Sequence, residues 1–262
     1  MRIIVTIKQV PDTTNVKIDS RTGTLIREGV PSIINPEDKN ALEAALQLRE
    51  RYGGEVIVIS MGPPQAEDAM REALAIGADQ AVLLSDRALA GADTWATAYT
   101  LGTAIKKIGN YDLILAGRQA IDGDTAQVGP QLAEFLNLPQ VTYVRDLDVI
   151  DGKKVVAKRT LEDGFEEIEA PLPALLTITK EANTPRYPHA GAIITAYRER
   201  KVTRWGVQDI GADPESLGLK GSPTQVKRSF SPPPKEPGQI LKGGPPEAAK
   251  DLVAILRQKN II

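Results

Sequence analysis

The sequence predicts an α/β fold built on a doubly wound, mostly parallel sheet. Short apolar runs alternate with helical patterns through the first half of the chain, as they do in such sheets. After Pro139 the pattern changes to alternating strands joined by turns, which predicts an antiparallel extension. Residues 211–246 are rich in Gly and Pro, and they predict an extended arm that leads to a last helix.

Composition narrows the functional classes. The chain has 262 residues, 42% of them apolar, which is enough for one large domain. Its 34 acidic and 32 basic residues leave no positive surplus, so we expect no nucleic-acid partner. The absence of Cys excludes disulfides, thiolate metal sites and a cysteine nucleophile. No apolar run approaches the roughly 20 residues of a membrane span. We therefore expect a cytoplasmic protein without direct membrane insertion, attached to a membrane only through a partner complex.

The first half predicts four strand–helix pairs. Asn35 is a good N-cap with Pro36 at the first helical position, Asp93 can cap a later helix, and Gly53 and Gly77 are helix stops. A small hairpin of Val16–Ile18 and Thr24–Ile26 follows the first strand. The expected strands are Ile3–Val10, Glu55–Ser60, Ala81–Asp86 and Tyr111–Gly117. The expected helices are 36–52, 64–76, 94–108 and 125–137.

The second half predicts strands first and an arm afterwards. Asp151-Gly152 is a strong hairpin turn between Gln140–Ile150 and Lys154–Thr160. Further strands are expected at Phe165–Ile168 and Leu175–Thr179, and helices at Ala192–Arg198 and about Pro246–Gln258. The last helix has one apolar face, which either folds back or packs on a partner subunit. We expect a nucleotide-binding domain over 1–210, with its antiparallel extension at about 140–180, and an arm over 211–262.

The loop 117–130, GRQAIDGDTAQVGP, follows a predicted strand at the edge where such sheets bind ligands. It is neither a GxGxxG nor a P-loop motif. Asp124 and Gln127 have the spacing of a capping box, which would leave the amides of Thr125, Ala126 and Gln127 facing the loop. Gly123 lets the backbone approach a ligand closely. The pattern favours a nucleotide phosphate held by backbone N–H groups, and an ordinary capped connection is the alternative.

Other motifs are less specific. GADT (91–94) places Thr94 and Thr97 on one helix face, although a capped helix with surface threonines explains it as well. Met61 after a strand fits the core or a flat ring, and His189 fits a turn. No paired carboxylates or activated nucleophile are evident, so any chemistry is expected to belong to a bound cofactor.

Together these motifs resemble the β-subunit of electron transfer flavoproteins. The matching stretches run in order along the whole chain: KQVPDT, NPED, ISMGP, ALAIGAD, GRQAIDGDTAQVGP and the PRY loop. The resemblance implies a heterodimer with an α-subunit that carries FAD, and an adenine-nucleotide α-hydrolase-like fold with a five-stranded parallel core. Ordinary members hold a structural AMP in the β-subunit, and electron-bifurcating members hold a second FAD there.

Two features are similar to the bifurcating branch. Gly123 replaces an acid and Val128 a threonine of the ordinary loop, and GADTxAT matches the segment beside the isoalloxazine ring. In that branch NADH delivers a hydride to the β-FAD. One electron then passes to ferredoxin or flavodoxin and the other, through the α-FAD, to a dehydrogenase or quinone oxidoreductase. The nucleotide-binding residues that the resemblance implies are Thr6, Asn35, Asp38, Met61, Thr94, Thr97, Gly123, Asp124, Thr125, Ala126, Gln127 and Val128.

The resemblance also implies two contact regions. Residues 183–200 match the partner-recognition loop, although the tip His189-Ala190-Gly191 departs from the leucine that ordinary members present. Residues 211–262 match the arm that packs on the α-subunit. NADH oxidation is then expected only in the complex. The alternatives are an ordinary electron transfer flavoprotein with AMP and a stand-alone adenine-nucleotide-binding module.

Overall fold

The computed structural model describes residues 1–12, 17–18, 25–26, 31–228 and 238–262. The chain forms two compact units, Met1–Val226 and Lys227–Ile262. The first holds the sheet and its covering helices, and the second holds helix α7 (Pro245–Gln258). The composition of the sequence changes after residue 210, but the boundary between the two units lies later, after Val226. Leu217 and Ser222, which lie between these two points, are buried in the first unit.

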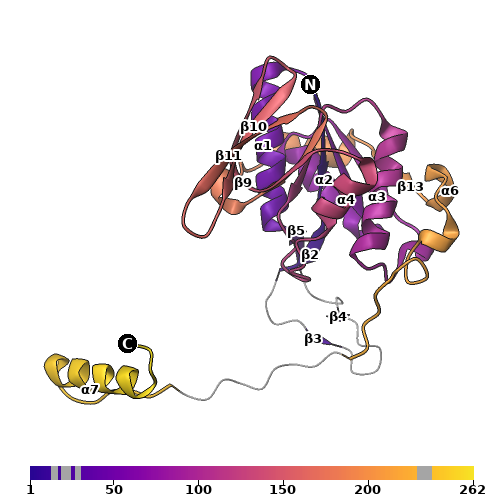
Figure 1. The fold of residues 1–262 in the computed structure, drawn as a ribbon. Helices are drawn as coiled ribbons and strands as arrows, with labels where there is room; N and C mark the ends of the chain where they lie inside the picture. Colours follow the sequence, from indigo (N-terminus) through magenta and orange to yellow (C-terminus); the bar gives the residue numbers. More distant parts are fainter. Residues whose placement is uncertain (13–16, 19–24, 27–30, 229–237) are drawn as a thin grey trace. The chain divides into compact units, whose positions relative to one another are not determined.

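A nine-stranded sheet forms the centre of the first unit, in the order β11-β10-β9-β12-β8-β1-β6-β7-β13. From β9 to β13 all neighbours are parallel. β10 and β11 continue the sheet antiparallel beyond β9, and Figure 1 shows these three strands together at one edge. The doubly wound fold and its antiparallel extension are therefore confirmed, and β9 and β13 widen the parallel core beyond five strands. The strands are β1 Arg2–Thr6, β6 Glu55–Met61, β7 Gln80–Leu84, β8 Leu113–Gly117, β9 Gln140–Ile150, β10 Lys154–Thr160, β11 Phe165–Pro171, β12 Ala174–Ile178 and β13 Val202–Trp205.

The expected first strand, Ile3–Val10, is wrong in its second half. The chain leaves the sheet after β1, because the Lys8 N–H is taken by the Asp38 carboxylate instead of a neighbouring strand. Its continuation, β2 (Gln9–Pro11), pairs with β5 (Ser32–Ile34) in a separate two-stranded sheet. The predicted hairpin is present as β3 (Lys17–Ile18) paired with β4 (Leu25–Ile26). Val16 and Thr24, its other predicted residues, lie outside the described residues.

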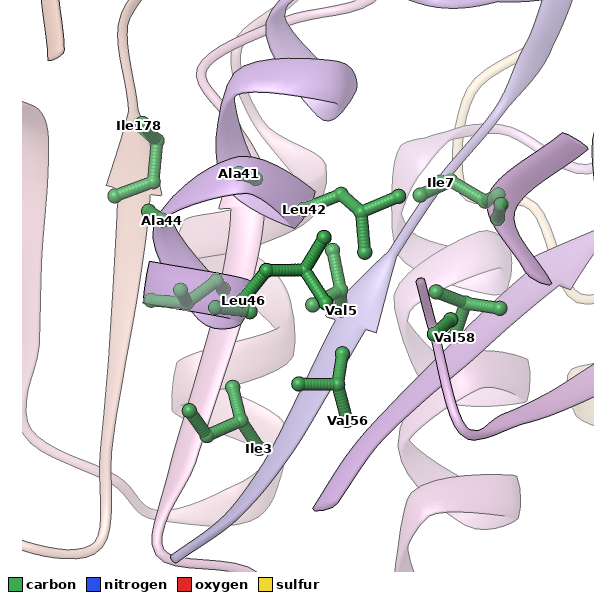
Figure 2. Packing of buried hydrophobic residues seen from close by; sticks show 14 of the residues in the cluster. Ile3, Val5, Ile7, Ala41, Leu42, Ala44, Leu46, Val56, Val58 and Ile178 are labelled. Carbon is green, nitrogen blue, oxygen red and sulfur yellow. The ribbon is translucent and has the colours of Figure 1, made fainter. Parts of the chain in front are cut away.

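Helices cover both faces of the sheet. Alternate residues of β1 point to opposite sides, so Ile3 and Val5 belong to one buried cluster and Ile4 to another. The first cluster packs against α1 (Pro36–Tyr52) and α2 (Glu67–Ile76), and Figure 2 shows its central residues. The second packs against α3 (Thr94–Ile108) and α4 (Val128–Leu136). Both faces are therefore apolar, which explains the continuous apolar runs of the central strands.

The remaining elements complete the first unit. Helix α5 (Ala190–Arg198) packs on α2, and the short α6 (Val207–Ile210) follows β13. Short 3₁₀ turns occur at Pro64–Ala66, Arg87–Leu89, Lys180–Ala182 and Pro214–Ser216. The hairpin turn at Asp151-Gly152 is confirmed, and both residues have positive φ. Among the described residues no helix is both long and apolar enough to span a bilayer.

Candidate functional site

The site is located by the reversal of strand order at β1. The chain moves from β1 to β6 and β7 on one side, then returns to β8 on the other side of β1. The loops after β1 and β8 therefore separate at the carboxyl edge of the sheet, where doubly wound folds bind their ligands. The loop after β8 is the GRQAIDGDTAQVGP segment.

The first turn of α1 holds these two loops together through Asp38. One oxygen of its carboxylate accepts from the Lys8 N–H at 2.8 Å, and the other accepts from the Gly117 N–H at 3.1 Å. A Cβ at residue 117 would lie 2.2 Å from Asp38 Oδ1, so this contact requires glycine. Burial raises the pKa of Asp38 to about 7, although Asn35 and the two backbone donors favour the carboxylate.

Two neighbours of Asp38 extend this attachment. The Asn35 side chain donates to the Gln119 carbonyl at 2.8 Å and accepts from the Ile121 N–H at 3.0 Å. Glu37 accepts from the Gln119 N–H at 3.1 Å and pairs with Arg118 at 3.3 Å. Asn35 lies at the N-cap position as predicted, but its side chain makes no cap hydrogen bond. A direct nucleotide contact of Asn35 or Asp38 stays a prediction, since both side chains already bind the loop.

Both aspartates of the loop have partners within the protein. Asp122 accepts from Lys8 Nζ at 2.6 Å, and Asp124 accepts from the Gln119 side-chain amide at 2.8 Å. The predicted capping box of Asp124 and Gln127 is wrong. Helix α4 begins at Val128 instead of residue 125, and no side chain caps it. Asp124 has φ of 50°, and its carboxylate is turned to Gln119, so it cannot serve the helix.

The uncapped start of α4 presents a run of unpaired backbone donors. No hydrogen bond joins the N–H groups of residues 125–129 to any part of the chain that the structure describes. Ala126 has φ of 53° and Gln127 has φ of −102°, an alternation of hand that turns successive N–H groups toward one point. Such a concavity at a helix N-terminus binds anions, especially phosphate.

Helix α3 places Thr94 beside this loop. Its hydroxyl donates to Gln127 Oε1 at 3.1 Å. The two helices approach closely at Gly102, where a Cβ would lie 2.2 Å from the Phe135 ring. The Asp93 cap is confirmed, because Oδ1 accepts from the Ala96 N–H at 3.0 Å. Oδ2 accepts from the N–H and hydroxyl of Thr224, at 3.0 and 2.7 Å.

The other predicted site residues lie along the same edge. Thr6 is the buried last residue of β1, and Met61 is the half-buried last residue of β6. Thr97 is half-buried in the first turn of α3, and Gly123 is exposed with no atom within 4 Å of a Cβ built on it. Thr94 and Gln127 are in direct contact although they are 33 positions apart, and the predicted residues Asn35 and Asp38 are in contact within the start of α1.

The sequence analysis did not identify the residues whose side chains hold the loop 117–130 in place. Lys8, Glu37, Gln119 and Asp122 make these contacts, and Lys8 and Asp122 are 114 positions apart in the chain. The one available signal was position, since Lys8 lies near the end of the expected first strand and Asp122 lies in the loop after β8. Pairing them needs the knowledge that β1 and β8 are neighbours.

The segment 183–200 is attached to the same helix α1, further along. Asn40 and Asn183 exchange hydrogen bonds at 2.8 and 3.0 Å, and Arg186 binds Glu43 and Glu50. Burial opposes ionisation of Glu43, but the Arg186 guanidinium holds the pKa of that carboxyl below its usual value. Tyr187 next to Arg186 is 93% exposed. A hollow of about 430 Å³ lies between the end of α2 and this segment, and no residue of the loop 117–130 lines it.

Comparison with known proteins gives the family. The electron transfer flavoprotein domain matches residues 22–210. A caffeyl-CoA reductase-Etf complex subunit, CarD, of Acetobacterium woodii is 59% identical, and the alignment covers 100% of both chains. The electron transfer flavoprotein β subunit of Thermoanaerobacterium thermosaccharolyticum is 57% identical over 100% of both chains. The acryloyl-CoA reductase electron transfer subunit gamma of Anaerotignum propionicum is 45% identical, again over 100% of both. The chain therefore belongs to the electron transfer flavoprotein family and matches its β subunits along its whole length.

Proposed function

We propose that this chain is the β subunit of a heterodimeric electron transfer flavoprotein that binds FAD and takes part in electron bifurcation. In the complex with an FAD-carrying α-subunit, bound FAD would accept a hydride from NADH and release single electrons to two acceptors. The low-potential acceptor is a ferredoxin or flavodoxin, and the other is a dehydrogenase or quinone oxidoreductase reached through the α-subunit. The names of two relatives, which belong to CoA-reductase assemblies, support such a dehydrogenase-type partner.

The observation that carries the proposal is the run of unpaired N–H groups at the uncapped start of α4. These donors lie at the carboxyl edge of the sheet, where no acidic side chain occupies the first turn of the helix. Backbone donors at a helix start suit a phosphate, and this supports a dinucleotide bound through its diphosphate. Gln127 and Thr94 would orient the ligand next to it, because their side chains meet at 3.1 Å.

Three features support FAD over AMP. Gly123 leaves open space in the loop, where the ordinary family members carry an acid. Val128 replaces a threonine at the start of α4. Thr94 and Thr97 lie in the first turn of α3, directly beside the phosphate loop, so a ligand that extends beyond its phosphates would meet them. Their role would be to position a flavin ring and tune its environment, without acid–base chemistry.

One observation favours the ordinary AMP-binding alternative. Of the two adjoining helix starts, α3 is already capped by the Asp93 carboxylate and only α4 is open. A single open terminus is sufficient for one phosphate. The two candidates therefore differ in whether the ligand ends at the phosphate or continues along α3.

Cofactor analysis tests the proposal. The chain should be co-expressed with its α-subunit, and the nucleotides released by denaturation should be separated and quantified. We expect two FAD for each heterodimer. One FAD and one AMP would replace the proposal with the ordinary carrier, and a stable monomer that binds nucleotide alone would favour a stand-alone module.

Substitution on α3 tests the flavin contact. Thr94→Val and Thr97→Val should lower FAD retention while AMP affinity changes little. Thr103→Val is a matched control on the same helix, because its hydroxyl bonds only the Tyr99 carbonyl one turn back. Equal loss of FAD in the control would show that the helix itself had been disturbed.

A further inference from the structure

We propose that Ser222 and Thr224, near the end of the first unit, are positioning residues for the nucleotide site. Both hold Asp93, the residue before α3, although they follow it by 129 and 131 positions in the chain. The inference rests on the proposed nucleotide site and adds a distant support for the start of α3. Ser222 and Thr224 act through Asp93, without touching the ligand.

Asp93 is bound from two sides. On the side of α3, Oδ1 of its carboxylate accepts from the Ala96 N–H at 3.0 Å. On the other side, its N–H donates to Ser222 Oγ at 2.8 Å, and Oδ2 accepts from the N–H and the hydroxyl of Thr224 at 3.0 and 2.7 Å. Asp93 therefore links the start of α3 to the segment 222–224 through both its backbone and its side chain.

Ser222 is the buried half of this attachment. The residue is 8% exposed, and its hydroxyl accepts from the Asp93 N–H and donates to the Gly218 carbonyl at 2.7 Å. Removing the hydroxyl would leave a donor and an acceptor unsatisfied where water has little access, which is costly. Thr224 is exposed, so water can replace its hydroxyl more easily. We therefore expect Ser222 to contribute more than Thr224.

The segment 217–224 is itself held close to the turn that precedes α3. The Leu219 N–H donates to the Ala90 carbonyl at 3.1 Å. Gly218 has φ of 52°, and a Cβ on it would lie 2.2 Å from the Ala88 carbonyl oxygen. Only glycine allows two backbones to approach so closely in this conformation. The segment therefore presents its hydroxyl groups to Asp93 from a fixed position.

The position of Asp93 matters because the next residue faces the loop 117–130. The Thr94 hydroxyl donates to Gln127 Oε1 at 3.1 Å, and the Thr97 N–H donates to the Asp93 carbonyl at 3.0 Å. A displacement of Asp93 would therefore move both threonines relative to the start of α4. AMP would need only the backbone donors of α4, whereas a flavin ring would also depend on Thr94 and Thr97. Loosening Asp93 should thus weaken FAD binding more than AMP binding.

Nucleotide titration of the α/β heterodimer tests this role. The variants are Ser222→Ala, Thr224→Val and the double variant, and the probes are FAD and AMP added to complex depleted of β-bound nucleotide. The double variant should raise the dissociation constant for FAD about tenfold and that for AMP less than about threefold. Thr224→Ser keeps the hydroxyl and should bind FAD as wild type does.

Amide hydrogen exchange without added nucleotide tests the positioning by itself. Asp93 accepts from the N–H groups of Ala96 and Thr97, so their exchange should become about fivefold faster or more in the double variant. Thr103→Val is the matched control, because its hydroxyl donates to the Tyr99 carbonyl within α3 at 2.8 Å. It should leave exchange at Ala96 and Thr97, and the affinity for FAD, as in wild type.

The outcomes separate the inference from the proposed function. Equal losses of FAD and AMP affinity in the double variant would overturn the inference, because they would indicate a general loss of structure. Wild-type FAD affinity, or unchanged exchange at Ala96 and Thr97, would overturn it too, since Asp93 would then not depend on Ser222 and Thr224. If wild-type complex binds no FAD in the β subunit, the proposed function fails, and the exchange measurement still decides whether Ser222 and Thr224 position α3.

Discussion

Helices α3 and α4 begin side by side after nearly identical sequence signals, yet their first turns are built differently. GADT ends at the first residue of α3 and GDTA lies just before α4, so each start combines glycine, aspartate and threonine. Asp93 caps α3 and also binds Thr224. Asp124 turns away from α4 to Gln119, and the helix starts at Val128 with its N–H groups unpaired.

The difference shows that an aspartate caps a helix only when its backbone geometry and neighbouring hydrogen-bond donors leave its carboxylate facing that helix. Asp93 has extended backbone geometry, with φ of −77° and ψ of −172°, which points its carboxylate at the helix it precedes. Asp124 has a left-handed φ and a nearby amide donor that satisfies it elsewhere. The start of α3 is therefore capped within the chain, and the start of α4 has no side-chain cap.

The largest expected effect concerns α1, a third helix that begins near the carboxyl edge of the sheet. It tests whether an uncapped helix start such as that of α4 can be satisfied in another way. It also lacks a side-chain cap, but it carries the buried Asp38, whose pKa is raised to about 7. The folded protein thus holds the Asp38 proton more tightly than the unfolded chain does. Stability from this group is full below about pH 4 and is lost as pH rises through about 7.

The unfolding free energy of wild type should therefore fall relative to Asp38→Asn by on the order of 2–4 kcal/mol between pH 4.5 and pH 8. Denaturant titrations of both proteins across this range measure the difference. Parallel pH profiles would show that Asp38 is not a buried, reluctantly ionised group, and the contrast between α1 and α4 would lose its basis.

The second prediction tests how tightly the start of α4 is packed against the sheet. A Cβ at Gly129 would lie 2.6 Å from the Thr177 methyl group on β12, so Gly129→Ala should cost about 1–3 kcal/mol. Gly123→Ala is the matched control, because nothing lies within 4 Å of its Cβ, and it should stay within about 0.5 kcal/mol of wild type. Urea denaturation measures both. Equal costs would mean that the loop and the helix start are packed alike.

The third prediction compares the two aspartates directly. Asp93→Ala removes a cap and the link to Thr224, and it should cost about 1–2 kcal/mol. Asp124→Gly suits the positive φ at that position and should cost less than about 1 kcal/mol. Thermal unfolding of both variants provides the comparison. A larger loss for Asp124→Gly would restore a structural role for that aspartate at α4.

The smallest effect is expected at Ala126, whose left-handed φ shapes the open amides. Ala126→Gly should change stability by less than about 0.5 kcal/mol, because relief of strain offsets a more flexible unfolded chain. Ala126→Val should cost about 1–2 kcal/mol and weaken AMP binding, since a branched side chain resists this conformation. Calorimetry of unfolding and binding measures both quantities. Unchanged AMP affinity in the valine variant would show that the left-handed conformation at residue 126 is not required for AMP binding.

Local signals predicted the architecture well. Apolar runs identified the central strands, Gly53 and Gly77 ended α1 and α2, and Asp93 marked the start of α3. The site was predicted less completely, because its geometry depends on distant partners. The chain leaves the sheet near Lys8 because the Lys8 N–H donates to Asp38. The Asp124 carboxylate is turned away from α4 because it accepts from the Gln119 side-chain amide. Neither interaction leaves a periodic pattern in the sequence, and the ion pair of Lys8 with Asp122 follows only from strand order.

Helix α1 fixes the relative orientation of two regions that are far apart in the sequence. Its start binds the loop 117–130 through Asn35, Glu37 and Asp38, and its later turns bind the segment around Arg186. An α-helix advances about 100° and 1.5 Å with each residue. Inserting one residue after Asn40 would therefore rotate the Arg186 attachment around the helix axis while leaving the loop 117–130 in place. The orientation of the Arg186 segment relative to the loop 117–130 therefore depends on the number of residues between their two attachment points on α1.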